Sequence, residues 1–284
     1  MRCWTTPCTP TPSSSCTPSC DRRLWAPPVR IGLIADIQGN LHALEAVLAA
    51  LAHPGGGRPG VDATLCAGDL VGYAAHPNEV VLRVRAGGIP SVVGNQDQAV
   101  GWGLPRANRQ PAAPRTEILR RAALEWTQGQ LHAEHRAYLR GLPRLMRLPL
   151  SDRSVTVLHA GIDTLDDWLT PDDPPALEAL ARRLSSDVVV LGHTHRPFEY
   201  RCAGTLFINP GPVGRSVDGD PRASFAVLDL DTLQADFVRL DYDLPGATDA
   251  ISRSGLPGEL SVLIAQGRAA CGEGRPPLTL KELP

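Results

Sequence analysis

Residues 29–52 read VRIGLIADIQGNLHALEAVLAALA and carry the clearest structural signal in the chain. Val29–Ala35 is a short, nearly continuous apolar run, which is typical of a strand buried on both faces. Leucine and valine then recur at helical spacing through Asn40–Ala52. The segment therefore predicts a buried strand and an amphipathic helix, with the polar residues Asp36–Asn40 in the turn between them.

The same order of elements repeats further along the chain. Asp62–Ala67 and Ile89–Val93 read as short buried strands, and Pro77–Ala86 between them reads as a helix with proline in its permitted first turn. This regular alternation of strands and helices predicts a layered α/β core.

A helical insertion interrupts the alternation. Gly101–Arg115 is loop-like, and Thr116–Gly129 and Leu131–Leu142 read as two helices that end before Pro143. We expect residues from about 105 to 143 to form a small helical cap.

Strands resume after the cap, and two weak helices follow Pro245. The last four expected strands have no helix between them, which predicts antiparallel pairing in a second sheet. One helix is expected at Ala176–Leu184. The expected strands are Leu145–Leu150, Ser154–Leu158, Asp187–Leu191, Phe198–Cys202, Thr205–Ile208, Ser224–Asp231 and Ala235–Tyr242.

Composition and charge narrow the class of protein. The chain has 284 residues, of which 43% are hydrophobic and 20% are charged, as in an ordinary folded domain. No apolar run approaches the ~18 residues of a membrane-spanning helix. A net charge of −2 provides no basic field for nucleic acid or an anionic membrane. We therefore expect a small-molecule partner, with no membrane and no tightly bound nucleic acid.

Residues 1–28 are rich in Thr, Pro, Ser and Cys and contain almost no aliphatic side chains. Such a composition cannot bury enough surface to fold, so we expect a disordered tail or an over-long start. Four of the seven cysteines lie there without a finger-like spacing, and the odd count argues against a disulfide framework and for a reducing cytoplasm. We expect one domain over residues 29–245, followed by a helical extension over residues 246–284.

Polar clusters stand where the expected strands end. Open α/β sheets place their ligand crevice outside the carboxyl ends of the strands, so these side chains should converge on one rim. Two carboxylates, an amide and three imidazoles form a mixed N/O ligand set, which suits first-row transition metals and zinc. The clusters are Asp36–Asn40, Gly68-Asp69, Gly94–Asp97, His159 and Gly192–His195.

Taken singly, most of these clusters have an ordinary structural explanation. A pair such as Gly68-Asp69 is usually a turn, and Asn95 could simply adopt a left-handed turn. A lone histidine after a strand is more often structural than a ligand. The paired His193 and His195, flanked by small residues, are harder to explain by packing, and the order of all five clusters is harder still.

In order and placement, the clusters resemble those of the calcineurin-like metallophosphoesterase superfamily. Four further segments resemble its bacterial phosphodiesterase-like branch: LHALEAVL, GDLVGYAAHPNEV, WTQGQL with LRGLP, and NPGPVGRSVDGDPRASFAVLD. The resemblance covers roughly Val29 to Leu244. It implies an α/β (α+β) fold, a four-layer α/β/β/α sandwich of two mixed sheets with the helical cap inserted.

The resemblance also implies roles for individual residues. Asp69 would bridge two divalent metal ions and act in catalysis with Asn95, Gln96 and Asp97. Asp36 and His195 would serve one metal, and Asn95, His159 and His193 the other. We expect Mn²⁺ in first place, with Fe, Zn, Ni or Mg as alternatives. The implied metal ligands are Asp36, Gln38, Asp69, Asn95, His159, His193 and His195.

Two positions depart from the family pattern. Gln38 stands where the family has histidine, and an amide oxygen is a harder and weaker ligand than an imidazole. Gln38 therefore either binds its metal loosely or only hydrogen-bonds a metal-bound water. Gln96 stands where the family has a histidine thought to protonate the leaving group, and glutamine cannot titrate. Three other histidines could replace that donor, although each also reads as a surface residue: His76, His132 and His135.

Three further residues are candidates for substrate binding. Arg196 and Arg215 could hold phosphate oxygens through their bidentate guanidinium groups, although arginine in this arginine-rich chain is usually solvated surface. Asn40 opens the first helix, where backbone N–H groups favour anions, but it could equally serve as the helix N-cap.

The sequence thus predicts a phosphoesterase that hydrolyses phosphodiesters or activated phosphomonoesters by two-metal activation of water. One alternative is a catalytically weakened scaffold that binds a nucleotide or protein partner, which Gln38 and Gln96 favour. The six retained ligand positions argue against it. Another alternative is a dinucleoside polyphosphate hydrolase that uses the same machinery.

Overall fold

The first sheet is built around β1 (Arg30–Ile34), the strand expected at the start of the opening segment. β1 pairs in parallel with β2 (Ala63–Cys66) and antiparallel with β8 (Ala223–Asp229). β9 (Gln234–Leu240) pairs with β8 and completes the order β2-β1-β8-β9. The side chains from residue 31 to residue 34 are all buried, because both faces of β1 are covered.

The second sheet has the order β3-β4-β5-β7-β6. Its three central strands run parallel, and an antiparallel strand closes each edge. The strands are β3 (Leu145–Leu150), β4 (Arg153–Leu158), β5 (Val188–Val190), β6 (Phe198–Cys202) and β7 (Thr205–Asn209).

The computed structural model describes residues 29–53, 60–107 and 112–270. The expected tail over residues 1–28, with its four cysteines, and the last part of the C-terminal extension lie outside the described residues. Within the described ranges, no helix is both long enough and apolar enough to cross a membrane.

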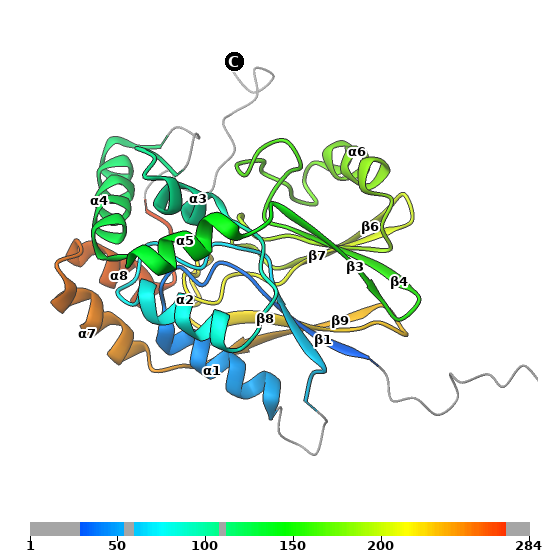
Figure 1. Cartoon of the computed structure of the whole chain (residues 1–284), viewed down its shortest axis with the longest axis horizontal. Helices are drawn as coiled ribbons and strands as arrows, with labels where there is room; N and C mark the ends of the chain where they lie inside the picture. The colour runs from blue at the N-terminus through cyan, green and yellow to red at the C-terminus, as the bar shows by residue number, and fades with distance from the viewer. Residues whose placement is uncertain (1–28, 54–59, 108–111, 271–284) are drawn as a thin grey trace, which may run out of the picture.

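The two sheets pack face to face, with helices on both outer sides (Figure 1). Apolar side chains such as Leu33 and Val190 fill the space between the sheets. α1 (Leu41–Ala52) and α2 (Pro77–Ala86) bury their apolar faces on the first sheet, and α6 (Pro174–Leu184) covers the second. This arrangement confirms the four-layer α/β/β/α sandwich.

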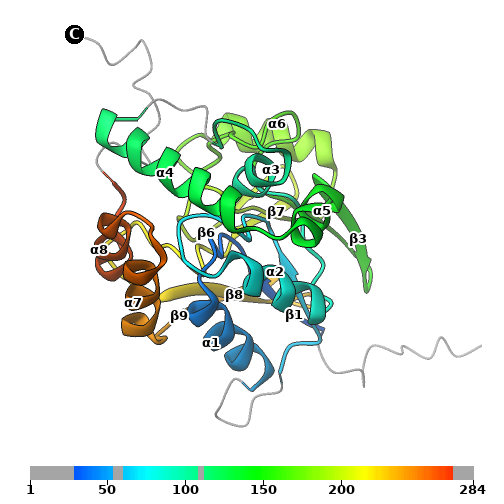
Figure 2. The ribbon, with the colours of Figure 1, turned by 60° about the vertical axis from the view of Figure 1, so that its left-hand side comes forward.

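The remaining helices gather at one end of the sandwich, on the left in Figure 1 and nearer the viewer in Figure 2. The expected C-terminal helices pack against the cap, since buried side chains of α4, α7 and α8 share one apolar cluster. The five helices are α3 (Asn95–Trp102), α4 (Pro114–Gln130), α5 (Ala133–Gly141), α7 (Leu244–Ser254) and α8 (Gly258–Gln266).

Two expected strand assignments are wrong. The segment Ile89–Val93 is not a strand but makes a single bridge between Ser91 and Cys66. Pro90 is the second residue of this segment, and a proline has no N–H with which to extend a ladder. The expected antiparallel pairing of the last four strands is confirmed for β6 with β7 and for β8 with β9. The two pairs do not form one second sheet, because each joins a different sheet.

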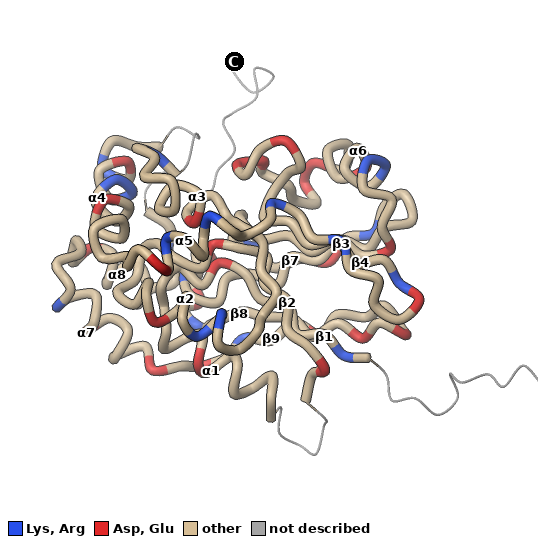
Figure 3. The backbone as a smooth tube through the Cα atoms, viewed as in Figure 1, with Lys and Arg blue, Asp and Glu red and all other residues tan. Residues whose placement is uncertain are grey.

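A helix lies where the sequence indicated a turn and a loop. α3 begins at Asn95 and ends at Trp102, so the polar cluster after the third apolar run is the first turn of a helix. Gly94 is its N-cap residue. Acidic and basic residues are interspersed along the described chain rather than gathered by sign (Figure 3).

Candidate metal centre

Four polar residues leave the ends of parallel strands at the same edge of the sandwich. Asp36 and Asp69 follow β1 and β2 of the first sheet, and His159 and His193 follow β4 and β5 of the second. All four are buried, with exposed fractions between 0% and 7%. The fold therefore brings carboxylates from one sheet to imidazoles from the other.

The backbone of this edge is bent at the residues that carry the polar groups. Nine described residues other than glycine have positive φ, and five of them belong to the polar clusters. Each such residue costs about 1–2 kcal/mol, and strain of this kind is concentrated at functional sites. The five are Asp36, Gln38, Asp69, His193 and His195, with φ between 53° and 67°.

A first group of donor atoms surrounds the carboxamide of Asn95. Its Oδ1 lies 2.9 Å from Nε2 of His159 and 3.0 Å from Nδ1 of His193. Oδ2 of Asp69 lies 3.6 Å from the same Nε2 of His159. An ion about 2.1 Å from its ligands holds neighbouring ligand atoms about 3.0–3.4 Å apart, so these spacings fit a divalent metal.

A second group of donor atoms shares Asp69 with the first. Oδ1 of Asp36 lies 3.4 Å from Nε2 of His195. One ligand atom each from Asp36, Asp69 and His159 falls within 4.8 Å of the others, so the two groups adjoin. Asp69 lies between them and can serve both.

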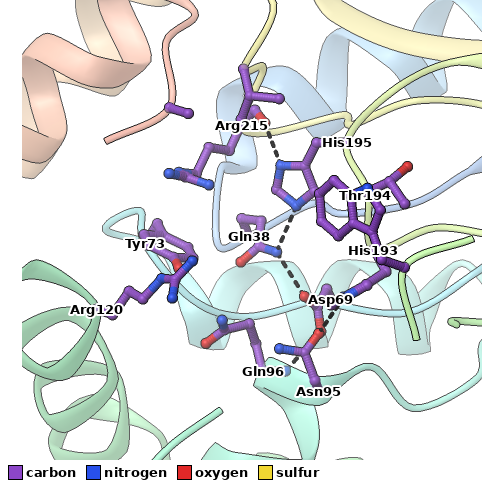
Figure 4. Close-up of a pocket in the computed structure, with 13 residues that line it drawn as sticks. Gln38, Asp69, Tyr73, Asn95, Gln96, Arg120, His193, Thr194, His195 and Arg215 are labelled. Atoms are coloured by element: carbon purple, nitrogen blue, oxygen red, sulfur yellow. Dashed lines mark hydrogen bonds between the residues drawn. The ribbon is translucent and has the colours of Figure 1, made fainter. Parts of the chain in front are cut away.

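Two imidazoles are oriented by backbone carbonyls. Nδ1 of His159 donates a hydrogen bond to the carbonyl of Ala67 over 2.8 Å, and Nδ1 of His195 donates to the carbonyl of Arg215 over 2.7 Å. In a neutral ring, each Nε2 then carries the lone pair, and Figure 4 shows the Nε2 of His195 directed toward Gln38. Such anchoring fixes the tautomer that a metal requires.

The side-chain amide of Gln38 lies between the carboxylate of Asp69 and the imidazole of His195. Its Nε2 donates to Oδ2 of Asp69 over 2.8 Å and lies 3.5 Å from Nε2 of His195. Its Oε1 is buried and has no hydrogen-bond partner. The amide nitrogen thus stands at the distances expected of a ligand, while the oxygen, which is the atom able to bind a metal, points away.

Burial controls the charge of the site. It raises the pKa of Asp69 to about 8, an effect that the neighbouring Asp36 carboxylate increases. Burial also lowers the pKa of His193 to about 3. Burial pushes the pKa of Asp36 upward too, but the imidazole of His195 and its neighbours hold that pKa below its usual value. A cation would therefore favour the ionised form of Asp69 by displacing a proton.

Asp69 is also held by α3. Its Oδ1 accepts a hydrogen bond from the backbone N–H of Gln96 over 2.8 Å, in the first turn of that helix. A Cβ on Gly94 would lie 2.0 Å from the same Oδ1, so only glycine allows the helix to approach this closely. The helix N-terminus thus supplies a donor to the shared carboxylate.

Two of the predicted site residues are engaged elsewhere. Asp97 accepts hydrogen bonds from the backbone N–H groups of Gly94 and Val71, over 3.0 and 3.1 Å, and caps α3. Asn40 accepts from the N–H of Ala43 as the N-cap of α1, and its amide donates to the carbonyl of Gly214. Both residues fall outside the described lining of the pocket above the centre.

The two predicted arginines differ in position. Arg215 lines the pocket, whereas Arg196 is exposed and its guanidinium carbon lies 6.0 Å from the ring centre of Trp168. Gln96 also lines the pocket, while the described lining does not include His76, His132 or His135. Sequence reasoning missed five residues of the described lining, none of which stands in a polar cluster after a strand: Tyr73, Arg120, Trp168, Val217 and Ala269.

Comparison with known proteins identifies this arrangement. The sequence model of the calcineurin-like phosphoesterase superfamily domain matches residues 29–233. The chain belongs to the calcineurin-like phosphoesterase superfamily. An uncharacterized protein of Methanocaldococcus jannaschii is 30% identical over 257 residues, covering 84% of this chain and 98% of that protein.

Solved structures agree with this assignment. A metallophosphoesterase from Sphaerobacter thermophilus is 31% identical with a TM-score of 0.68, and the match covers 85% of this chain and 100% of that one. A hypothetical protein from Pyrococcus horikoshii shares the fold, with 22% identity, a TM-score of 0.74 and coverage of 85% and 99%. Calcineurin-like phosphoesterases depend on metal, and this chain places a buried Asp/Asp/His group where its strands end. The bacterial branch inferred from the sequence stays a prediction.

Proposed function

We propose that the protein is a metal-dependent phosphoesterase that hydrolyses phosphodiester or activated phosphomonoester bonds with water as the nucleophile. One observation carries the proposal. Nδ1 of His159 donates to Ala67, and in the tautomer with a proton on Nδ1 alone the lone pair on Nε2 faces Oδ1 of Asn95 across 2.9 Å. Two acceptors at this distance repel each other, and a cation between them would turn the repulsion into coordination.

Both donor groups enter the proposal. Asn95, His159 and His193 would hold one divalent ion, Asp36 and His195 would hold another, and Asp69 would contact both; we propose Mn²⁺ first. When bound, such ions lower the pKa of water and polarise phosphoryl oxygens. The part of the protein is to fix the ligand tautomers and to hold Asp69 in place through the N-terminus of α3.

The chemistry of Gln96 restricts the substrate. Its side chain lines the pocket but cannot donate a proton to a departing alkoxide. General acid help is typically worth about 10²–10⁴ in rate, and esters with good leaving groups need it least. Aryl esters, activated monoesters and diesters are therefore the substrates to expect.

A metal add-back assay tests the proposal. The protein is stripped of metal with a chelator, and turnover of bis-aryl and mono-aryl phosphates is measured with Mn²⁺, Ni²⁺, Zn²⁺ or Mg²⁺ restored. We expect turnover with at least one ion, and its loss in Asn95→Leu, with Asn78→Leu on α2 as the control at another amide. Absence of turnover with every ion, together with no metal retained on the purified protein, would exclude the proposed phosphoesterase activity.

A scaffold that binds a nucleotide or protein partner is the second candidate. The hydrogen bond from Gln38 to Asp69 favours it, because the amide occupies a position at which a ligand would otherwise face the metal. Metal bound at both groups without turnover of any phosphoester would support the scaffold. Hydrolysis of dinucleoside polyphosphates is a substrate variant of the first candidate. We also propose a cytoplasmic location, which is consistent with the unpaired Cys66 and Cys202.

A further inference from the structure

The helical cap donates hydrogen bonds to the end of α3 that lies opposite the metal centre. The last four carbonyl groups of an α-helix have no partner within the helix. Three successive carbonyls at the end of α3 each accept a hydrogen bond from a different side chain of the cap, and we call these three side chains the cap clamp. The pairs are Gln128 with Ala99 over 3.0 Å, Arg136 with Val100 over 2.8 Å and Arg140 with Gly101 over 2.7 Å.

The cap clamp also connects its own helices to one another. Nε2 of Gln128, on α4, donates a second hydrogen bond to the carbonyl of Leu104 over 2.9 Å, just beyond the end of α3. A second N–H group of Arg136, on α5, donates to the backbone carbonyl of Gln128 over 2.6 Å. Arg136 and Arg140 are also cations at the negative end of the α3 dipole, where positive charge is favoured. The three helices are therefore joined by one connected set of hydrogen bonds.

Apolar packing holds the same helices in contact. α3 lies directly against α4 and α5 (Figure 2). Val100 of α3 shares one buried apolar cluster with Leu124 of α4 and Leu139 of α5. A Cβ added to Gly101 would lie 3.5 Å from the Cβ of Leu139, which is van der Waals distance. The end of α3 is thus fixed relative to the cap.

The opposite end of α3 carries groups of the metal centre. Asn95 is its first residue, and the backbone N–H of Gln96 donates to the shared carboxylate of Asp69. Nδ2 of Asn95 donates to the carbonyl of Ala107 over 3.2 Å, and this bond leaves Oδ1 facing the two imidazoles. α3 has 8 residues and a length of about 12 Å, so its two ends move together.

We propose that Gln128, Arg136 and Arg140 are positioning residues for the metal centre, which act through α3 on Asn95 and on the N–H group of Gln96. The proposal rests on the metal-dependent function proposed above. Without the cap clamp, α3 would shift against the sandwich, and Oδ1 of Asn95 would leave its place between the imidazoles. The cap thereby contributes to metal binding, although all three residues fall outside the described lining of the pocket.

Two measurements on the metal-free full chain test the cap clamp without turnover. Calorimetry gives the affinity for Mn²⁺ in the wild type and in Gln128→Leu, Arg136→Met and Arg140→Met. We expect each variant to bind Mn²⁺ about 3–10-fold more weakly, which is less than the roughly 10–100-fold effect of losing a direct partner of a ligand. The visible absorption spectrum of the Co²⁺-loaded protein reports the geometry of the ligands, and it should change in the same variants.

Controls and conservative variants separate positioning from stability. Gln130→Leu and Arg121→Met remove exposed side chains of the same types from α4, and we expect Mn²⁺ affinities within about twofold of the wild type. Arg140→Lys keeps a donor for its one carbonyl and should restore the affinity. Arg136→Lys should restore only part of it, because Arg136 donates to two carbonyls. Urea unfolding without metal confirms that each variant is folded.

Two results would overturn the cap clamp. Lower stability with wild-type Mn²⁺ affinity and an unchanged Co²⁺ spectrum would make the three residues purely structural, and this result could accompany full turnover in the wild type. Equal losses in Gln130→Leu and Arg121→Met would assign the effect to the surface of the cap. If Mn²⁺ affinity depends on the cap clamp but the wild type hydrolyses no phosphoester, the proposed function fails while the positioning role stands.

Discussion

Gln38 donates a hydrogen bond from Nε2 to Oδ2 of Asp69 across 2.8 Å, so an amide nitrogen faces the carboxylate that both donor groups share. The same nitrogen lies 3.5 Å from Nε2 of His195. For Gln38 to bind a metal, its amide must turn so that Oε1 replaces Nε2 at this position. The turn breaks the hydrogen bond to Asp69, which weakens the net gain from coordination.

Gln38→His should therefore tighten the metal held by Asp36 and His195. An imidazole supplies a better ligand and removes the competing N–H donor, and we expect the affinity of the weaker ion to rise about 10–100-fold. Equilibrium dialysis with metal analysis measures the stoichiometry and affinity for Mn²⁺. An unchanged stoichiometry and affinity would mean that Gln38 contacts only water or substrate. Gln38→Leu is the control, because it removes the N–H donor without adding a metal ligand.

Asp69→Asn should abolish binding at both donor groups together. The Asp69 carboxylate lies where the two groups of donor atoms adjoin, so its oxygens can serve both. A neutral amide cannot provide two anionic oxygens. The measurement is metal content after gel filtration, beside turnover. Asp236→Asn, an exposed change of the same kind on β9, serves as the control. Full activity in Asp69→Asn would rule out the bridging role.

Metal affinity should rise with pH up to about pH 8. Burial in the folded protein without metal raises the pKa of Asp69 to about 8. Below this pH, an ion that binds must therefore displace the proton on the Asp69 carboxyl. Calorimetry in two buffers of different ionisation enthalpy should detect about one proton released from Asp69 at pH 6 and almost none at pH 9. Proton release that does not change between these values would contradict the burial of a neutral Asp69.

The same shift affects the stability of the protein without metal. A carboxyl with a raised folded pKa stabilises the fold at low pH, and this contribution is lost as the pH rises from about 4 toward 8. Urea unfolding in the presence of a chelator should follow this direction. Saturating metal should flatten or reverse the dependence.

Gly94→Ala should impair metal binding and reduce stability by about 1–3 kcal/mol. The new Cβ would lie 2.0 Å from Oδ1 of Asp69 and 2.4 Å from its backbone nitrogen. Gly129→Ala on α4 is the matched control, because nothing lies within 4 Å of its added Cβ and alanine favours a helix. Denaturant unfolding should leave the control unchanged or about 0.5–1 kcal/mol more stable. Metal binding by Gly94→Ala equal to the wild type would show that α3 can move away freely.

The core of the fold and the floor of the site were accessible from the sequence for one physical reason. Apolar runs such as the one at β1 identify strands buried on both faces, and polar residues directly after them must lie at the strand ends. Parallel strands of one sheet end together, so Asp36 lies near Asp69 and His159 near His193. The two pairs meet because the two sheets pack face to face. The topology of the last four strands was not accessible, because antiparallel pairing alone does not specify the sheet to which each hairpin belongs.

The walls of the pocket were beyond the reach of pattern reasoning. Arg120 stands on an amphipathic helix, where an arginine ordinarily faces water, and only the packing of α4 against α7 and α8 turns it toward the centre. The catalytic role that the resemblance implies for Asp97 stays a prediction, and the structure shows Asp97 accepting hydrogen bonds from the backbone of Gly94 and Val71. The position of Arg120 thus depends on tertiary contacts that the local sequence does not reveal.

Asp36 and Asp69 of the metal centre follow strands of one sheet, and His159 and His193 follow strands of the other. An ion held by both sheets would act as a clasp across the sandwich, in a chain whose described cysteines form no disulfide. Removal of the ion would then lower the free energy of unfolding of the whole sandwich by the free energy of metal binding. Resistance to proteolysis should fall with it.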